Sequence, residues 1–265
     1  MRQRFRLTIL AVILGLVWPP VVQAQVEGLE ADDLDQPRDK SEEGDAAAPS
    51  RADVASGWQA FLDGDYETAI ADLEPAAQAG DATAQYYLGV LYDHGEGVAR
   101  NYRTAADWYE KAAAQGHREA QFKLGFLHYT GGGQPAGPSA LARNPEAAAR
   151  WFEPAANAGH PMASYLLCRM VDEGRGVERD LDRALSLCRA AADHGVTGAQ
   201  YNTALLLTEQ STDRENWTEA YTWFLLATRA NYPGAKQNLN VVAKWLNEAD
   251  IIRARAAADA WQPKN

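Results

Sequence analysis

The stretch AQYYLGVLYDHGEGV, residues 84–98, decides the fold, because its order of residue types recurs along the chain. Residues 120–132 read AQFKLGFLHYTGG, and residues 163–177 read ASYLLCRMVDEGRGV. The alanines that lead successive copies are separated by 36, 43, 36 and 36 residues; they are Ala84, Ala120, Ala163, Ala199 and Ala235. A period in this range is typical of a solenoid, in which each repeat buries its apolar faces against its neighbours.

Each repeat is predicted to be an antiparallel pair of α-helices. Apolar residues fall at helical spacing twice per repeat, first over residues 84–92 and again over residues 105–112. Between these helices, Gly95 and Gly97 supply positions that tolerate positive φ, which ends the first helix and turns the chain back. A polar N-cap is expected before the second helix of successive repeats; the residues are Asn101, Asn144 and Asp180.

The combined signature, LG…Y…GxGV…A..WY..AA..G, resembles that of the Sel1-like repeats, which are relatives of the tetratricopeptide repeats. The resemblance covers residues 57–261 and implies an all-α fold, a right-handed α/α solenoid of Sel1-like helix-pair repeats that extends over residues 57–265. The units are expected at residues 57–80, 81–116, 117–159, 160–195 and 196–231, with a C-terminal cap at 232–261. In this cap, Asn247 and Asp250 resemble a capping box.

The repeat at residues 117–159 carries seven extra residues in the turn between its helices. The inserted stretch, Thr130–Pro138, is rich in glycine, but it lacks the Gly-Lys-Ser/Thr ending of a phosphate-binding loop and follows a helix. Insertions into a solenoid map to one edge of the array. The stretch is therefore a candidate contact loop, and the alternative is an inert insertion.

The first 24 residues have the pattern of a secretory signal peptide. Three arginines precede an apolar run over residues 7–18, which is too short to span a bilayer. Small residues at the −3 and −1 positions predict cleavage between Ala24 and Gln25; the alternative is an uncleaved signal anchor. The mature protein is expected to be periplasmic or secreted, without stable insertion in a membrane.

An acidic linker is predicted at residues 25–56. It carries ten acidic and three basic side chains and no aromatic residue, so it cannot bury enough apolar surface to fold. The formal charge of the whole chain is −11, and such an acidic balance argues against nucleic acid or an anionic membrane as the main partner.

Two cysteines, Cys168 and Cys188, lie in the two helices of one repeat. Cys168 replaces the glycine equivalent to Gly89, and Cys188 replaces the aromatic residue equivalent to Tyr109. Both positions are expected to face inward between the helices. In an oxidising compartment a disulfide between them is predicted, although an offset along the helices would forbid the bond.

Neither a catalytic motif nor a metal-ligand spacing is present in the sequence. The five histidines show no i, i+4 pair and are interpreted as solvated turn residues. No nucleophile elbow occurs, and no cofactor is expected. The protein is therefore predicted not to be an enzyme. A weak β-lactamase-like hydrolase, which the resemblance to cysteine-rich Sel1 relatives suggests, is the alternative.

An aromatic residue recurs on successive first helices, on the side that the resemblance assigns to the concave face. This ladder could bind a peptide or a partner helix, or it could be ordinary repeat packing. The neighbouring positions vary more, as recognition positions do. The candidate partner-binding residues are Tyr86, Val90, Asp93, Phe122, Phe126, Tyr165, Arg169 and Tyr201. The resemblance implies an adaptor that binds one or more protein partners, such as an envelope signalling or assembly protein.

Overall fold

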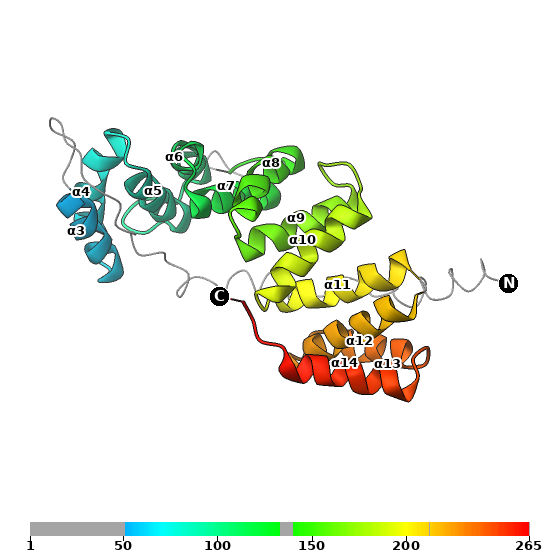
Figure 1. Cartoon of the computed structure of the whole chain (residues 1–265). Helices are drawn as coiled ribbons and strands as arrows, with labels where there is room; N and C mark the ends of the chain where they lie inside the picture. The colour runs from blue at the N-terminus through cyan, green and yellow to red at the C-terminus, as the bar shows by residue number, and fades with distance from the viewer. Residues whose placement is uncertain (1–50, 133–139, 212, 265) are drawn as a thin grey trace. The chain divides into compact units, whose positions relative to one another are not determined.

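The computed structural model describes residues 51–132, 140–211 and 213–264, and every regular element within them is an α-helix (Figure 1). The predicted signal peptide, with its cleavage site at Ala24 and Gln25, lies outside the described residues. So do most of the predicted linker and residues 133–139 of the candidate contact loop. The all-helical architecture predicted from the sequence is confirmed.

The described chain falls into two compact bodies, which meet in the sequence between Asp180 and Leu181. The first body contains the helices α3 (Arg51–Leu62), α4 (Tyr66–Gln78), α5 (Ala82–His94), α6 (Tyr102–Ala114), α7 (Arg118–Thr130), α8 (Pro145–Asn157) and α9 (Pro161–Glu173). The second body contains α10 (Leu181–Asp193), α11 (Thr197–Gln210), α12 (Arg214–Arg229), α13 (Ala235–Ala243) and α14 (Glu248–Ala260).

Within each body, most helices pack on the helix that precedes them and on the one that follows them, which is the contact pattern of a helical repeat array. In the first body these contacts run without a break from α3 to α9, and in the second they run from α10 to α12, on which both α13 and α14 pack. The predicted linker boundary at residue 56 falls inside α3, which begins at Arg51. The helix extends upstream because Val54 and Trp58 pack against the core of the first body.

In the turn between the two helices of a repeat, the predicted glycine ends the first helix and the predicted N-cap begins the second. An arginine before the N-cap also takes part, and the sequence did not predict its role. Gly95 ends α5 in the left-handed conformation with φ of 75°, and Asn101 caps α6 by accepting hydrogen bonds from two backbone N–H groups. Arg100, which precedes this cap, donates two hydrogen bonds from its guanidinium to the carbonyl of His94 at the end of α5. Arg100 and Asn101 therefore provide hydrogen-bond partners for backbone groups at the end of α5 and at the start of α6, which have none within their own helices.

The arginine recurs before the second helix of the next two repeats. Arg143 donates from Nε to the carbonyl of Thr130 at 2.8 Å, and Arg179 donates from Nε to the carbonyl of Asp172 at 2.7 Å. The predicted N-cap Asn144 accepts from the backbone of Ala147, as expected. The arginine position therefore belongs to the repeat scaffold.

A second glycine in each turn lies against the preceding repeat. A Cβ placed on Gly97 would come within 2.7 Å of Tyr66 Cβ at the start of α4, and one placed on Gly132 within 2.6 Å of the Tyr102 ring at the start of α6. At Gly176 the neighbour is the Pro145 backbone at the start of α8, at 2.4 Å. These turns hold adjacent repeats at a separation that only glycine allows.

In the second body, the C-terminal tail returns to the turn between α10 and α11. The backbone N–H of Lys264 donates to the carbonyl of Asp193, and its ammonium pairs with the Asp193 carboxylate at 2.6 Å. The carbonyl of Lys264 lies 2.9 Å from His194 Nδ1. The tail thereby ties the last helix of this body to its first.

Replacement of Gly176 by alanine tests the close approach between repeats. We expect Gly176→Ala to lower the free energy of unfolding by about 2–4 kcal/mol, because positive φ and overlap with the Pro145 backbone both oppose a side chain. The matched control is Gly116→Ala. Gly116 also has positive φ, 87°, but has no atom within 4 Å of its would-be Cβ, so a loss of about 1 kcal/mol is expected. Denaturant unfolding measures both; equal losses would contradict the role of the close approach.

Candidate protein-binding surface

The aromatic ladder proposed from the sequence lies largely inside the repeat packing. Tyr86 is 5% exposed and Tyr165 2% exposed, while Phe122 and Tyr201 are half-buried. The Tyr86 ring stacks on His117 at a centroid distance of 4.7 Å, and Phe122 stacks on His160 at 4.2 Å. These contacts bridge successive repeats, so they favour the packing explanation for this position over partner binding.

The interpretation of His117 and His160 as solvated turn residues is wrong. Each is a half-buried N-cap of a first helix, and its Nδ1 accepts a hydrogen bond from the backbone three residues on, at Ala120 and Ala163 respectively. Asp81 occupies the same position before α5 and caps it through a carboxylate oxygen. The shared repeat position of the two histidines was visible in the sequence, but their capping role was not, because histidine is an uncommon N-cap.

Two other candidate residues on the first helices are also buried. Val90 is 8% exposed and Arg169 is 6% exposed. The Arg169 guanidinium lies 3.6 Å from the Glu173 carboxylate and 5.8 Å from the Tyr165 ring centroid. A partner could not contact these side chains without displacing their neighbours, so their role in binding stays a prediction that the geometry does not favour.

Asp93 and Phe126, like Phe122 and Tyr201, are partly accessible. Asp93 lies in the last turn of α5, and the hydroxyl of Tyr109 on α6 donates a hydrogen bond to its carboxylate at 3.2 Å. Burial raises the pKa of Asp93, while the positive charge of Lys123 on α7 acts in the opposite direction. Phe126 follows Lys123 by one helical turn and contacts Phe122, with ring centroids 6.1 Å apart. We refer to Asp93, Tyr109, Lys123 and Phe126 as the Asp93 cluster.

The next repeat shows that the repeat fold does not need the polar members of this cluster. There, Tyr129 stands at the position of Asp93, and Phe152 stands at the position of Tyr109. The two rings lie 6.1 Å apart, so an aromatic contact replaces the carboxylate and the phenol hydroxyl. Comparison of the two repeats in the sequence could have revealed the paired exchange of Asp93 and Tyr109. Tyr109 and Lys123 were not predicted as members of a binding site.

The two cysteines are buried, at 1% exposure for Cys168 and 0% for Cys188. In the two preceding repeats, the equivalent positions are in contact. A Cβ placed on Gly89 would come within 2.5 Å of the Tyr109 ring, and one on Gly125 within 2.7 Å of the Phe152 ring. In the repeat that follows, Cys168 thus replaces the glycine and Cys188 replaces the aromatic residue that faces it. The bond between Cys168 and Cys188 stays a prediction, which this exchange supports.

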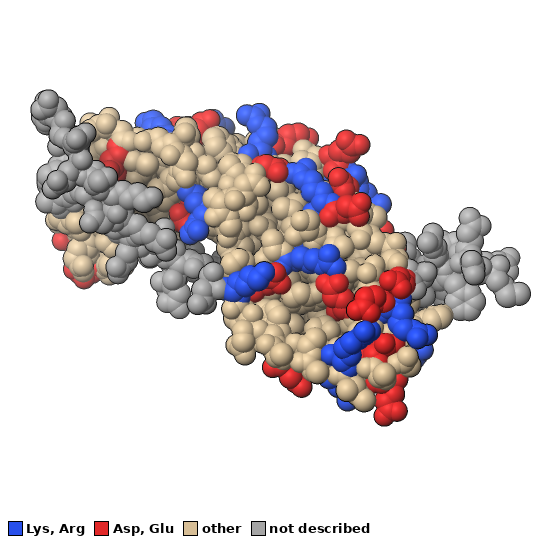
Figure 2. All heavy atoms as spheres, viewed as in Figure 1, with Lys and Arg blue, Asp and Glu red and all other residues tan. Residues whose placement is uncertain are grey.

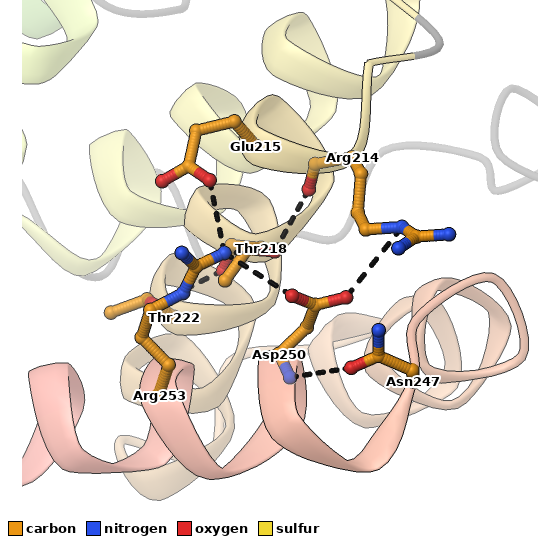
Figure 3. Close-up of polar contacts among 7 residues, drawn as sticks. All are labelled: Arg214, Glu215, Thr218, Thr222, Asn247, Asp250 and Arg253. Atoms are coloured by element: carbon orange, nitrogen blue, oxygen red, sulfur yellow. Dashed lines mark hydrogen bonds and ion pairs between the residues drawn. The ribbon is translucent and has the colours of Figure 1, made fainter.

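A dense polar cluster in the second body resembles a functional site but stabilises the terminal helices (Figure 3). Asp250 on α14, 8% exposed, accepts a hydrogen bond from Arg253 at 3.2 Å and lies 3.7 Å from the guanidinium of Arg214 on α12. Arg253 also pairs with Glu215 of α12 at 2.9 Å. Asn247 caps α14 by accepting from the backbone of Asp250, which is one half of the predicted capping box. The cluster joins α14 to α12.

The described residues contain no group of three or more histidine, cysteine or acidic side chains that could hold a metal ion. None of the helices in the described part of the chain combines the length and the hydrophobicity that a membrane span requires.

Comparison with known proteins identifies the repeats. The family model of the Sel1 repeat matches residues 82–117, 118–160 and 161–196, within one residue of the units expected from the sequence. A Sel1 repeat protein from Oxalobacter formigenes has a similar crystal structure, with a TM-score of 0.64 and 25% identity over 79% of this chain and 85% of that one.

A second solved structure is c5321, described as a protective antigen present in uropathogenic Escherichia coli strains displaying an SLR fold. It gives a TM-score of 0.50 and 21% identity over 79% of this chain and 52% of that one, so the likeness concerns the fold alone. No curated protein matches the sequence. Together with the family model, these likenesses show that residues 82–196 form three Sel1 repeats and that the chain has the helical solenoid fold of the Sel1-repeat structures.

Proposed function

We propose that the protein is a non-enzymatic adaptor or regulator of the bacterial periplasm or cell envelope, which binds a partner protein through its first helices. Sel1-repeat proteins generally mediate protein–protein interaction, and the fold is typically a non-enzymatic scaffold. The observation that carries the proposal is the Asp93 cluster, where a half-buried carboxylate lies near a lysine and a phenylalanine of the following first helix.

The carboxylate of Asp93 opposes the stability of the first body. Burial favours its neutral form, and its place in the last turn of α5 sets a negative charge beside the negative end of the helix dipole. Tyr129 and Phe152 fill the equivalent space in the next repeat without a charge. Residues that lower stability where an apolar alternative exists are typical of functional sites.

The cluster also has the composition of a binding surface. Asp93 and Lys123 present opposite charges from two successive first helices, and Phe126 adds a half-buried aromatic side chain beside them. Such a combination of a central aromatic residue and flanking charges is common where proteins bind one another. A partner segment would align its own charges with this pair and place an apolar side chain on Phe126.

The location in the periplasm rests on residues 1–24 and on the cysteines. The pattern of a cleaved signal peptide predicts export from the cytoplasm, and disulfides persist in oxidising compartments.

Replacement of Asp93 by asparagine tests the stability argument. We expect Asp93→Asn to raise the free energy of unfolding at pH 7, because the ionised carboxylate is disfavoured in the folded chain. As the pH falls through the raised pKa, Asp93 becomes protonated and its cost disappears, so the difference between variant and wild type should shrink toward pH 4. The control is Asp107→Asn on the exposed surface of α6, which removes the same charge outside the cluster and should leave the stability close to that of the wild type. A variant less stable than wild type at pH 7 would contradict the argument.

Site-specific photo-crosslinking in living cells tests the binding surface. A photoreactive phenylalanine at position 126 should give a discrete cross-linked product, whereas the same residue at Trp108, an aromatic position on the second helix α6, should not. The charge reversal Lys123→Glu should reduce the product at least tenfold. Lys111→Glu, which changes the same residue type beside Trp108, should leave it unchanged. Equal products from positions 126 and 108 would exclude the first helices as the binding surface.

Mass spectrometry of the protein from fractionated cells tests its location and its covalent state together. The expected result is a periplasmic protein whose first residue is Gln25, with a peptide that links Cys168 to Cys188 before reduction. An intact N-terminus, or two free thiols, would contradict the corresponding part of the proposal.

A further inference from the structure

The large hydrophobic side chains that are exposed within the described residues all lie at the two ends of the helix series. Leu62, which is 52% exposed, ends the first described helix, α3. Trp245, 49% exposed, lies between α13 and α14, and Ile252, 60% exposed, lies on α14. In a repeat array each internal unit is covered on both sides, whereas each terminal unit lacks one neighbour. Exposed apolar residues at these ends therefore indicate surfaces that another unit can cover.

The two ends carry opposite charges. Residues 54–81, which contain most of α3 and all of α4, have six acidic side chains and no basic one, a net charge of −6; the acids are Asp63, Asp65, Glu67, Asp72, Glu74 and Asp81. Residues 235–264, which contain α13, α14 and the tail, have five basic and three acidic side chains, a net charge of +2. This excess of positive charge runs against the acidic balance of the chain. We refer to these two stretches as the acidic end and the basic end.

Part of the positive charge at the basic end is available to a partner. Arg253 and Lys264 form ion pairs inside the second body. Lys236, Lys244 and Arg255 are exposed and form no ion pair among the described residues. Basic side chains are visible beside acidic ones over the terminal helices (Figure 2).

We propose that copies of this chain associate head to tail, with the acidic end of one copy against the basic end of the next. Leu62 then packs against Ile252 and Trp245 of the other copy, and the acidic side chains around Leu62 face Lys236, Lys244 and Arg255. A contact between two identical acidic ends would set −6 against −6, so charge disfavours a two-fold arrangement there. A head-to-tail contact is heterologous, so it leaves one end of each kind free for a further copy unless the assembly closes into a ring.

Sedimentation velocity tests this association on protein purified from cells that express the full chain. The average mass of the wild type should rise with protein concentration, and the increase should weaken in high salt, which screens the charges. Leu62→Lys and Ile252→Glu should each leave the protein monomeric, because each places on one end a charge of the same sign as the end that it would contact. A mixture of the two variants should associate again, because one supplies an intact basic end and the other an intact acidic end.

Two controls separate the contact from general effects of charge and folding. Glu178→Lys and Ala190→Glu change exposed side chains away from both ends and should associate like the wild type. All four substituted side chains are exposed, so thermal unfolding should stay close to that of the wild type.

Several outcomes would overturn the proposal. A wild type that stays monomeric at all concentrations would do so, as would a mixture that stays monomeric. Loss of association in Ile252→Glu but not in Leu62→Lys would instead indicate contact between two basic ends. Loss on deletion of residues 25–50, with Leu62→Lys unaffected, would show that the acidic N-terminal segment, which carries a net −7, occupies the basic end.

Discussion

The contact between each turn glycine and the preceding repeat is the constraint on which the array depends. Gly97, Gly132 and Gly176 lie against the first residue of the preceding repeat's second helix, and at Gly176 the contact is with backbone. Because no side chain fits there, the separation between repeats is fixed by the backbone itself. The other contacts between repeats, such as the stacking of Tyr86 on His117, form at this spacing. An array held in this way transmits stability only between neighbours.

The repeat period and the glycines were sufficient to predict the helix pairs, because both follow from local backbone chemistry. Gly95 ends α5 and Asn101 caps α6, as the sequence predicted. The role of Arg100 was not predictable in the same way, since its partner is a backbone carbonyl that becomes available only when α5 ends. The capping by His117 was missed for a related reason, because the propensity of histidine for that position is low and the geometry of the turn overrides it.

The candidate surface was predictable only in part. The helical period correctly placed Tyr86 and Tyr165 on one face, but a period cannot tell a face that contacts the next repeat from one that meets solvent. Their burial follows from the stacking of repeats, which a single helix pattern does not contain. Asp93 and Phe126 are partly accessible. Tyr109 on α6 and Lys123 on α7 interact with Asp93 on α5, and the sequence pattern of one helix does not contain such contacts between three helices. Partner binding is thus proposed where Asp93, Tyr109, Lys123 and Phe126 come together.

Hydrogen exchange of the variant Gly97→Ala tests most directly whether contacts between repeats hold the array together. The account predicts that protection falls in α4 and in α5 together, because a side chain at residue 97 would separate the two repeats that meet at Tyr66. Protection in α8 and α9 should change much less, since stability passes between neighbours only. A loss confined to the turn at residues 95–101, with α4 unchanged, would contradict the account.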